Sequence, residues 1–253
     1  MRNVTIFAAM LIGAAAANAA PAVWESNYGT TIVGGDDATV SGVALGFAFP
    51  IFGTSYNSVE ASTNGFISFA PGNGAGCCSG ASSDLVARSP RLAAQWFDIV
   101  GDVRLNTDVA GRAVFTWTGG EYAYGGTFTA QAQLFSDGRM ILGFDGPSIP
   151  TGHSVLTGLS IGNGATDPGG RDLSGGSFSA GTTFYEVFSP GTFDLNQTNL
   201  FINPRAGGGF DVSSIAPAVT GAVPEPASWA LLTVGFGLAG SVLRRRRDRG
   251  LAA

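Results

Sequence analysis

Short β-prone runs follow one another through the middle of the chain, and turn-forming residues separate them. The runs recur at short intervals with glycine, proline, asparagine and aspartate between them, and no run between the two ends of the chain has a helical period. Six of them are VALGFAFPIF (43–52), RLAAQWFDIV (91–100), RAVFTWTG (112–119), VLTGLSIG (155–162), TFYEVF (183–188) and NLFINP (199–204). This pattern predicts an all-β domain, most simply an antiparallel β-sandwich.

The segment TFTAQAQLFSDGRMILGFD (127–145) shows the pattern in its clearest form. Its first run places apolar residues on one face of a strand and polar residues on the other: Phe128, Ala130, Ala132 and Leu134 against Thr129, Gln131 and Gln133. Such alternation predicts a half-buried strand. Asp137-Gly138 follows it, and Asn64-Gly65 divides SVEASTNGFISFA (58–70) in the same way. Both dipeptides predict hairpin turns.

The composition of this domain suits an extracellular protein and argues against nucleic acid as a partner. The chain has 39 glycines, no lysine and only 12% charged residues, which suits an extracellular β-rich protein with many turns. Residues 22–222 hold seven arginines against 16 acidic residues, a formal charge of −9. Phosphate backbones require a basic surface, so nucleic acid is not an expected partner. The length suits one domain, expected over 20–205.

The N-terminus has the three parts of a secretory signal peptide. Arg2 supplies the positive charge, VTIFAAMLIGAAAA supplies the apolar region, and Ala17-Asn18-Ala19 supplies the small residues that a signal peptidase reads. We expect cleavage after Ala19, so that residues 1–19 are removed. A structural helix is the alternative.

The C-terminus predicts a membrane helix that follows a proline-rich motif. Residues 227–243 carry no charge and reach the lower limit of about 17 residues for a helix that crosses the hydrocarbon core. A basic cluster at 244–249 follows and should remain cytoplasmic; it includes Arg244, Arg245, Arg246 and Arg247. The motif is Val223, Pro224, Glu225 and Pro226. A simple membrane anchor is one reading, with residues 206–222 as the linker.

These three parts, in this order over 223–249, resemble the PEP-CTERM sorting signal of Gram-negative bacteria. The resemblance implies recognition by an exosortase, a membrane-embedded protease that cuts near the proline-rich motif. The tail is then a temporary tether to the inner membrane, and the processed protein passes to the cell surface or extracellular matrix.

The runs between 43 and 164 resemble a nidogen-like extracellular β domain. The carrying stretches are LGFAFPIFGTSYNSVEASTNGFISF, SPRLAAQWFDI, AVFTWTGGEYAYGGTFTAQAQLFSDGRMILGF and GLSIGNG. The family pattern has an acidic pair after its central tryptophan, whereas Trp96 is here followed by Phe97, Asp98 and Ile99. The resemblance implies an adhesion or matrix module and no enzymatic activity.

Residues that could carry chemistry are few. His153 is the only histidine, so any serine or cysteine triad requires it; its turn-like surroundings favour a solvated loop residue. Asp98, Asp102 and Asp108 offer oxygen ligands of the kind Ca²⁺ prefers, although loop aspartates more often cap turns. Asp167 and Asp172 lie among glycines without the tandem repeat of a calcium-binding β-roll. No other cofactor is expected.

The two cysteines, Cys77 and Cys78, are adjacent in a glycine-rich loop. In an oxidising compartment three states are open to them: a vicinal disulfide, a disulfide between chains, or free thiols.

Aromatic residues suggest a ligand for the domain. Trp96 and Trp117 fall in strand-like runs, where burial is expected, whereas Tyr122 and Tyr124 flank Ala123 between glycine pairs. We expect these two rings to contact extracellular polysaccharide. The function class expected is thus a structural or adhesion protein of the biofilm matrix; the alternative is a secreted polysaccharide hydrolase with paired carboxylates such as Glu60 and Glu121.

Overall fold

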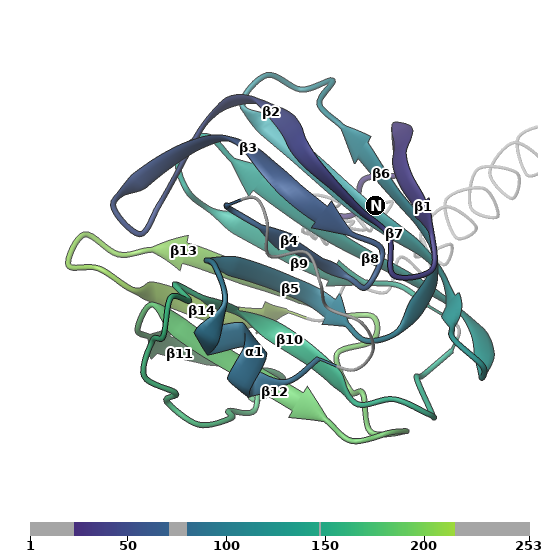
Figure 1. Cartoon of the computed structure of the whole chain (residues 1–253). Coiled ribbons are helices and arrows are strands. Elements are labelled where there is room, and N and C mark those ends of the chain that lie inside the picture. Colours follow the sequence, from purple (N-terminus) through teal and green to yellow (C-terminus); the bar gives the residue numbers. More distant parts are fainter. Residues whose placement is uncertain (1–22, 71–79, 147, 216–253) are drawn as a thin grey trace, which may run out of the picture. The chain divides into compact units, whose positions relative to one another are not determined.

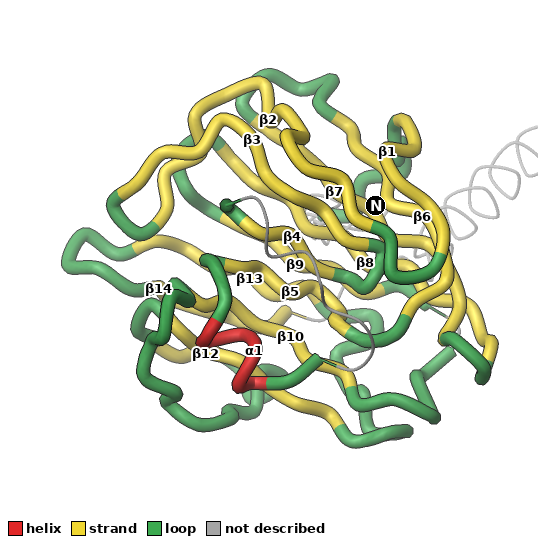
Figure 2. The backbone as a smooth tube through the Cα atoms, viewed as in Figure 1, coloured by secondary structure: helices red, strands yellow, loops and turns green. Residues whose placement is uncertain are grey.

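The structure, a computed structural model, describes residues 23–70, 80–146 and 148–215. The regular secondary structure of this part is β except for one short helix, α1 (Ser82–Ala87), as Figure 2 shows. Every strand pair is antiparallel. The all-β prediction is therefore confirmed. No helix of the described part is long and apolar enough to cross a membrane.

The strands form two sheets (Figure 1). The larger sheet has eight strands, in the spatial order β1 (Thr30–Gly35), β6 (Ile99–Asn106), β7 (Arg112–Glu121), β8 (Gly125–Phe135), β9 (Met140–Phe144), β13 (Asn199–Pro204), β14 (Phe210–Ile215) and β11 (Ser177–Ala180). The smaller sheet has six, in the order β12 (Thr183–Phe188), β10 (Val155–Ser160), β5 (Arg91–Trp96), β4 (Phe66–Ser68), β3 (Thr54–Ser62) and β2 (Thr39–Ile51).

The main core lies between the two sheets. Alternate residues of both inner faces supply it, among them Phe49, Ile67 and Leu92 from the smaller sheet and Phe115, Leu134 and Leu142 from the larger. Burial of each such side chain contributes about 1.5–3 kcal/mol. Trp117 also joins the sheets through a hydrogen bond, because its Nε1–H on β7 donates to the Ser62 carbonyl of β3 at 2.7 Å.

A second, smaller cluster covers the other face of the six-stranded sheet. Leu85 of α1 packs there with residues of four strands: Phe66, Ala93, Trp96, Leu156 and Tyr185. The Arg91 guanidinium stacks over the rings of Phe66 and Trp96, with its Cζ 4.1 and 4.7 Å from their centroids. Burial lowers the pKa of Arg91 to about 10. Trp96 and Trp117 are both buried, as the sequence predicts.

Both predicted hairpin turns are present. Gly65, with φ of 82°, closes the turn between β3 and β4, and Gly138, with φ of 85°, closes the turn between β8 and β9. In each case the glycine takes the left-handed conformation that other residues rarely adopt.

The prediction that the β8 segment is a half-buried strand is wrong in one respect. The side chains of Phe128, Ala130, Ala132 and Leu134 do enter the core, but Gln131 and Gln133 on the opposite face are buried as well. The N-terminal segment 23–29 covers them. The amide of Gln133 donates to the Val23 carbonyl, and Gln131 exchanges hydrogen bonds with the backbone of Glu25.

The predicted linker over 206–222 is also wrong in its first part. Residues 210–215 form β14, which pairs with β13 on one side and β11 on the other. The prediction followed the glycine, serine and proline content of 206–222 as a whole, although Phe210 and Val212 inside it are buried at alternate positions, as in a strand. Residues 216–222 lie outside the described residues.

Candidate functional site

The β7–β8 turn, the β5–β6 connection and the loop before β10 are bonded to one another. Glu121, the last residue of β7, pairs with Ile99 of β6. The backbone N–H of Tyr122 donates to the carbonyl of Asp98 at 3.0 Å. Asp98, Glu121 and Tyr122, which are candidate site residues in the sequence for three different reasons, are therefore neighbours.

The Glu121 carboxylate fixes the loop before β10. It is buried and accepts three backbone hydrogen bonds, from the N–H groups of Thr151 (2.8 Å), Gly152 (2.9 Å) and His153 (2.6 Å). The His153 ring adds a fourth contact, with Nδ1 3.0 Å from Oε1. Since an ionised carboxylate only accepts, Nδ1 carries the hydrogen in this pair. Both oxygens of Glu121 are occupied, so the side chain is a structural support for the loop.

The other ring nitrogen of His153 faces a second carboxylate. Its Nε2 lies 3.7 Å from Oδ2 of Asp98, and the His153 side chain is only 19% exposed. The prediction of a solvated loop residue is therefore wrong: the residue is in a loop, but Glu121 and Asp98 enclose its ring. In the described part of the chain no hydroxyl or thiol bonds to His153, so this arrangement is not that of a nucleophilic triad.

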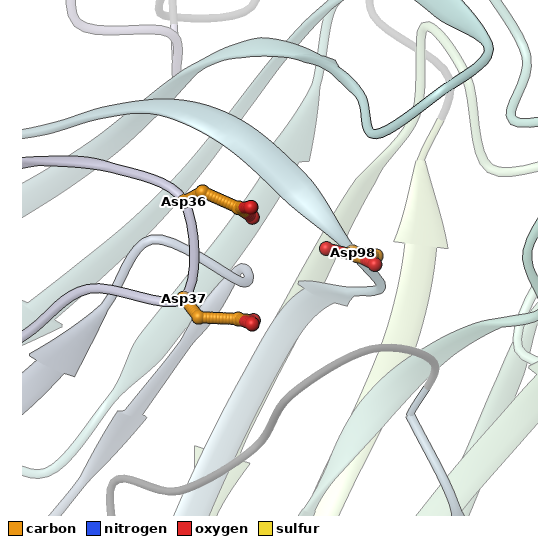
Figure 3. A group of neighbouring side chains, drawn as sticks. All are labelled: Asp36, Asp37 and Asp98. Carbon is orange, nitrogen blue, oxygen red and sulfur yellow. The ribbon is translucent and has the colours of Figure 1, made fainter.

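Asp98 also belongs to an acidic cluster, which we define as Asp36, Asp37 and Asp98 (Figure 3). Asp36 and Asp37 lie in the β1–β2 turn, and Asp98 lies between β5 and β6. One carboxylate oxygen from each residue lies within 4.8 Å of the others. Burial raises the pKa of Asp98, and the charge of Asp37 raises it further. The three carboxylates thus repel one another unless a cation or proton joins them.

The predicted grouping of Asp98 with Asp102 and Asp108 is not found. Asp102 lies on β6 opposite Gly34, and Asp108 accepts a hydrogen bond from the Asn27 amide at 2.9 Å. Among the described residues, the group that places three such ligand atoms together is the acidic cluster. Asp36 and Asp37 were not predicted, although two adjacent aspartates after Gly34-Gly35 were a signal that could have found them.

One buried side chain connects the turn that carries Asp37 to the connection that carries Asp98. Asn64, in the predicted hairpin turn, donates from Nδ2 to Asp37 Oδ1 at 2.7 Å and accepts from the N–H of Ile99 at 3.0 Å. The backbone N–H of the neighbouring Thr63 donates to the Ala38 carbonyl, and its side-chain Oγ1 accepts from the Ala38 N–H. The acidic cluster is therefore built on two loops that a single turn fixes.

The two predicted aromatic residues lie beside this group. Tyr122 is 48% exposed and Tyr124 is 61% exposed. The ring of Tyr124 packs edge-on against His153, with centroids 5.4 Å apart. It also lies so close to Gly152 that a Cβ there would be 2.1 Å from a ring atom. These two contacts restrain the Tyr124 ring from one side. The ligand role of both tyrosines stays a prediction.

The remaining predicted carboxylates serve turns or strands. Asp167 accepts hydrogen bonds from the Tyr185 hydroxyl (2.7 Å) and the Gly169 N–H (2.9 Å). Asp172 accepts from the N–H groups of Ser174 and Gly175. Glu60, on β3 of the smaller sheet, accepts from the Ser41 hydroxyl at 2.6 Å. None of the described contacts pairs Glu60 with Glu121.

Several predicted sites lie outside the described residues. They are Cys77 and Cys78, the motif Val223 to Pro226, the membrane helix 227–243 and the arginine cluster Arg244 to Arg247. The predicted signal peptide, residues 1–19, lies outside them as well.

Comparison with known families identifies two parts of the chain. The model of the NIDO-related family matches residues 16–139, which include the acidic cluster and both loop tyrosines but not His153. This match begins and ends earlier than the predicted extent of 43–164. The model of the PEP-CTERM protein-sorting motif matches residues 222–247. No curated protein and no solved structure matches the chain. The protein therefore carries a NIDO-related domain and a C-terminal PEP-CTERM sorting motif.

Proposed function

We propose that this chain is a non-enzymatic protein of the cell surface or extracellular matrix, and that its sandwich associates with extracellular polysaccharide. The sorting motif implies an exported protein that an exosortase recognises and that is processed at the membrane. Delivery to the outer surface or to the exopolysaccharide is the part that we propose. The two matched families are a sorting signal and a nidogen-like domain, and neither is an enzyme family.

The observation that carries the proposed ligand is the position of Tyr124. Its ring is exposed, yet His153 and the backbone at Gly152 restrain it from one side. A ring that is fixed before binding loses little conformational entropy when a ligand stacks on it. Tyr122 is exposed two residues away in the same turn and offers a second apolar face. Such rings with polar tips suit the mixed surface of a sugar.

The negative charge of the exported part narrows the class of polysaccharide that we expect it to bind. The exported part carries a formal charge of −9, and Asp36, Asp37 and Asp98 lie near the tyrosine turn. Like charges repel within a Debye length of about 8 Å at physiological salt. We therefore expect neutral or weakly acidic polymers to bind better than strongly anionic ones.

The alternative, a polysaccharide hydrolase, gains no support from the described geometry. A glycosidase needs one carboxylic acid and one carboxylate that face each other across the substrate. Glu60 lies on β3 of the smaller sheet and Glu121 at the end of β7 in the larger one. Glu121 has both oxygens occupied by the loop before β10.

Retention of the protein on the exopolysaccharide of its own strain tests the proposed function. The full chain, purified in detergent, is run through gels with and without the polymer. We expect retention by the polymer, its loss in Tyr124→Ala, and its persistence in Tyr124→Phe because the ring remains. Val187→Ala is a matched control, since Val187 is 44% exposed on β12 of the other sheet. Equal mobility of the unmodified chain in both gels would contradict the proposal.

A further inference from the structure

The acidic cluster contains a buried carboxylate, Asp98, one of whose oxygens has no hydrogen-bond partner among the described residues. Asp98 is only 6% exposed, and the oxygen without a partner in the described part is Oδ1. Its Oδ2 lies 3.7 Å from the His153 ring, beyond hydrogen-bond distance. A buried polar oxygen normally has a partner, and a buried charge without one is costly. The carboxylates of Asp36 and Asp37 point toward Asp98 from the facing turn (Figure 3).

From these contacts we propose that Asp36, Asp37 and Asp98 form a binding site for a divalent cation, and specifically for Ca²⁺. The site would give Oδ1 of Asp98 the partner that the described residues do not supply. It would also offset the repulsion among three like charges. The proposal does not depend on polysaccharide binding, because it rests on Asp98 and its neighbours and not on the tyrosine turn.

The ligand chemistry of the cluster favours Ca²⁺, and the spacing of its oxygens accommodates that ion. Ca²⁺ takes six to eight oxygen ligands at about 2.3–2.6 Å, so two ligand oxygens on opposite sides of the ion lie about 5 Å apart. The three oxygens, all within 4.8 Å of one another, fit that limit. Mg²⁺ binds at about 2.0–2.1 Å and requires a tighter octahedron. The group offers three carboxylates and no thiol, whereas zinc sites use mainly nitrogen and sulfur ligands.

The two outer ligands of the proposed site are exposed, so water molecules can supply the rest of the coordination shell. Asp36 and Asp37 lie at the surface, so water can complete the six to eight positions that Ca²⁺ requires. No arginine forms an ion pair with any of the three carboxylates in the part of the chain that the structure describes. An incoming cation therefore displaces no arginine, and the neighbour with which it would share Asp98 is His153, whose Nε2 lies 3.7 Å from Oδ2.

The site is also rigid before the ion binds. Asn64 holds Asp37 through its side-chain amide and holds the peptide after Asp98 through Ile99. Asp37 itself has φ of 51°, a left-handed conformation that aspartate tolerates better than most residues. Ligands that are fixed in advance lose less entropy when the ion binds.

Calcium titration of the full chain tests this proposal. The chain is purified in detergent, treated with a chelator and dialysed, then titrated with CaCl₂ in a calorimeter and in thermal unfolding. We expect saturable binding with a dissociation constant of about 10⁻⁴–10⁻³ M, the range of extracellular modules, and a matching rise in Tm. The same rise with NaCl at equal ionic strength would overturn the proposal, because it would show only screening. An equal saturable shift with MgCl₂ would overturn the assignment to Ca²⁺.

Three variants distinguish a site from a general effect of charge. Asp98→Asn removes the buried charge at nearly constant shape, and we expect it to weaken Ca²⁺ binding at least about tenfold, since affinity follows the charge of the ligands. Without Ca²⁺ its Tm should equal or exceed that of the unmodified chain, because the substitution removes a buried negative charge that lies beside two other carboxylates. Asp36→Asn, at the surface, should also weaken binding.

Asp102→Asn is the matched control, because Asp102 lies on the neighbouring strand β6 but outside the cluster. Its calcium affinity should stay within about twofold of the unmodified chain, as for independent sites. Unchanged affinity in Asp98→Asn, or an equal loss in Asp102→Asn, would overturn the proposal.

Discussion

The side-chain amide of Asn64 donates a hydrogen bond to Asp37 Oδ1 across 2.7 Å, between two turns that are 27 residues apart in the chain. The same side chain accepts a hydrogen bond from the Ile99 N–H and is fully buried. One amide thus bonds the carboxylate of Asp37 and the backbone of Ile99, the residue after Asp98. Replacement of Asn64 should therefore affect stability and the acidic cluster together.

We predict that Asn64→Ala lowers the free energy of unfolding by about 2–4 kcal/mol, because two hydrogen bonds are lost and the Ile99 N–H remains buried without an acceptor. Urea denaturation of the full chain measures the change. Asn57→Ala, at an exposed position of β3, should change it by less than about 0.5 kcal/mol. Equal effects of the two variants would show that the Asn64 amide does not hold the two turns.

Alanine substitutions at two glycines distinguish the free-energy cost of a left-handed conformation from that of a steric clash. Gly53 and Gly65 have φ of 74° and 82°, but a Cβ on Gly53 meets nothing within 4 Å, whereas a Cβ on Gly65 would lie 1.9 Å from the Gln95 carbonyl oxygen. Gly53→Ala should cost about 1–2 kcal/mol of unfolding free energy. Gly65→Ala should cost about 4 kcal/mol or more, because the backbone must move. Similar losses in the two variants would contradict the close approach at Gly65.

The stability of the loop before β10 should depend on the charge of Glu121. In Glu121→Gln one acceptor oxygen becomes an NH₂ group that faces backbone N–H donors, and we expect a loss of about 2–4 kcal/mol in unfolding free energy. Limited proteolysis should then cut within 145–154 faster than in the unmodified chain. Glu186→Gln is the control, since Glu186 accepts one backbone hydrogen bond, from Leu173, which the glutamine oxygen can keep. Unchanged proteolysis in Glu121→Gln would argue against this support of the loop.

How far the sequence predicts this fold depends on how local the determining interactions are. The turns at Gly65 and Gly138 were predictable because a dipeptide sets their backbone angles. The covering of Gln131 and Gln133 was not, because the covering segment is more than 100 residues away in the chain. The strand β14 was missed because the glycines before it made the whole stretch resemble a linker, although Phe210 and Val212 alternate within it as in a strand.

The same distinction between local and long-range interactions applies to the candidate site. Exposure of Tyr122 and Tyr124 followed from the glycine-bounded loop. The enclosure of His153 by two carboxylates did not, since Glu121 and Asp98 reach it from separate turns. Spacing along the chain grouped Asp98 with the wrong partners for a related reason: its neighbour Asp37 lies 61 residues earlier.

Protonation of Asp167 should account for part of the loss of stability at acid pH. The hydroxyl of Tyr185 and then the N–H of Gly169 lower the pKa of this carboxyl below its ordinary value of 3.8. Because the folded-state pKa is lowered, the ionised group stabilises the fold above about pH 4, and this contribution is lost as the pH falls through the folded-state pKa. Tyr185→Phe removes the main cause, so its Tm should approach that of the unmodified chain as the pH falls below about 4. A Tm difference that stays constant from neutral to strongly acidic pH would contradict this role of Asp167.

Intact-mass measurement of the mature protein, from a strain with active export machinery, tests the sorting account most directly. The account predicts a population that lacks residues 1–19 and ends near Pro224 to Pro226. Replacement of Pro224, Glu225 and Pro226 by alanine should leave membrane insertion unchanged, because insertion depends on the apolar run 227–243, and should block release. A mature population of the unmodified chain that still carries Arg244 to Arg247 would contradict processing and identify the tail as a permanent anchor.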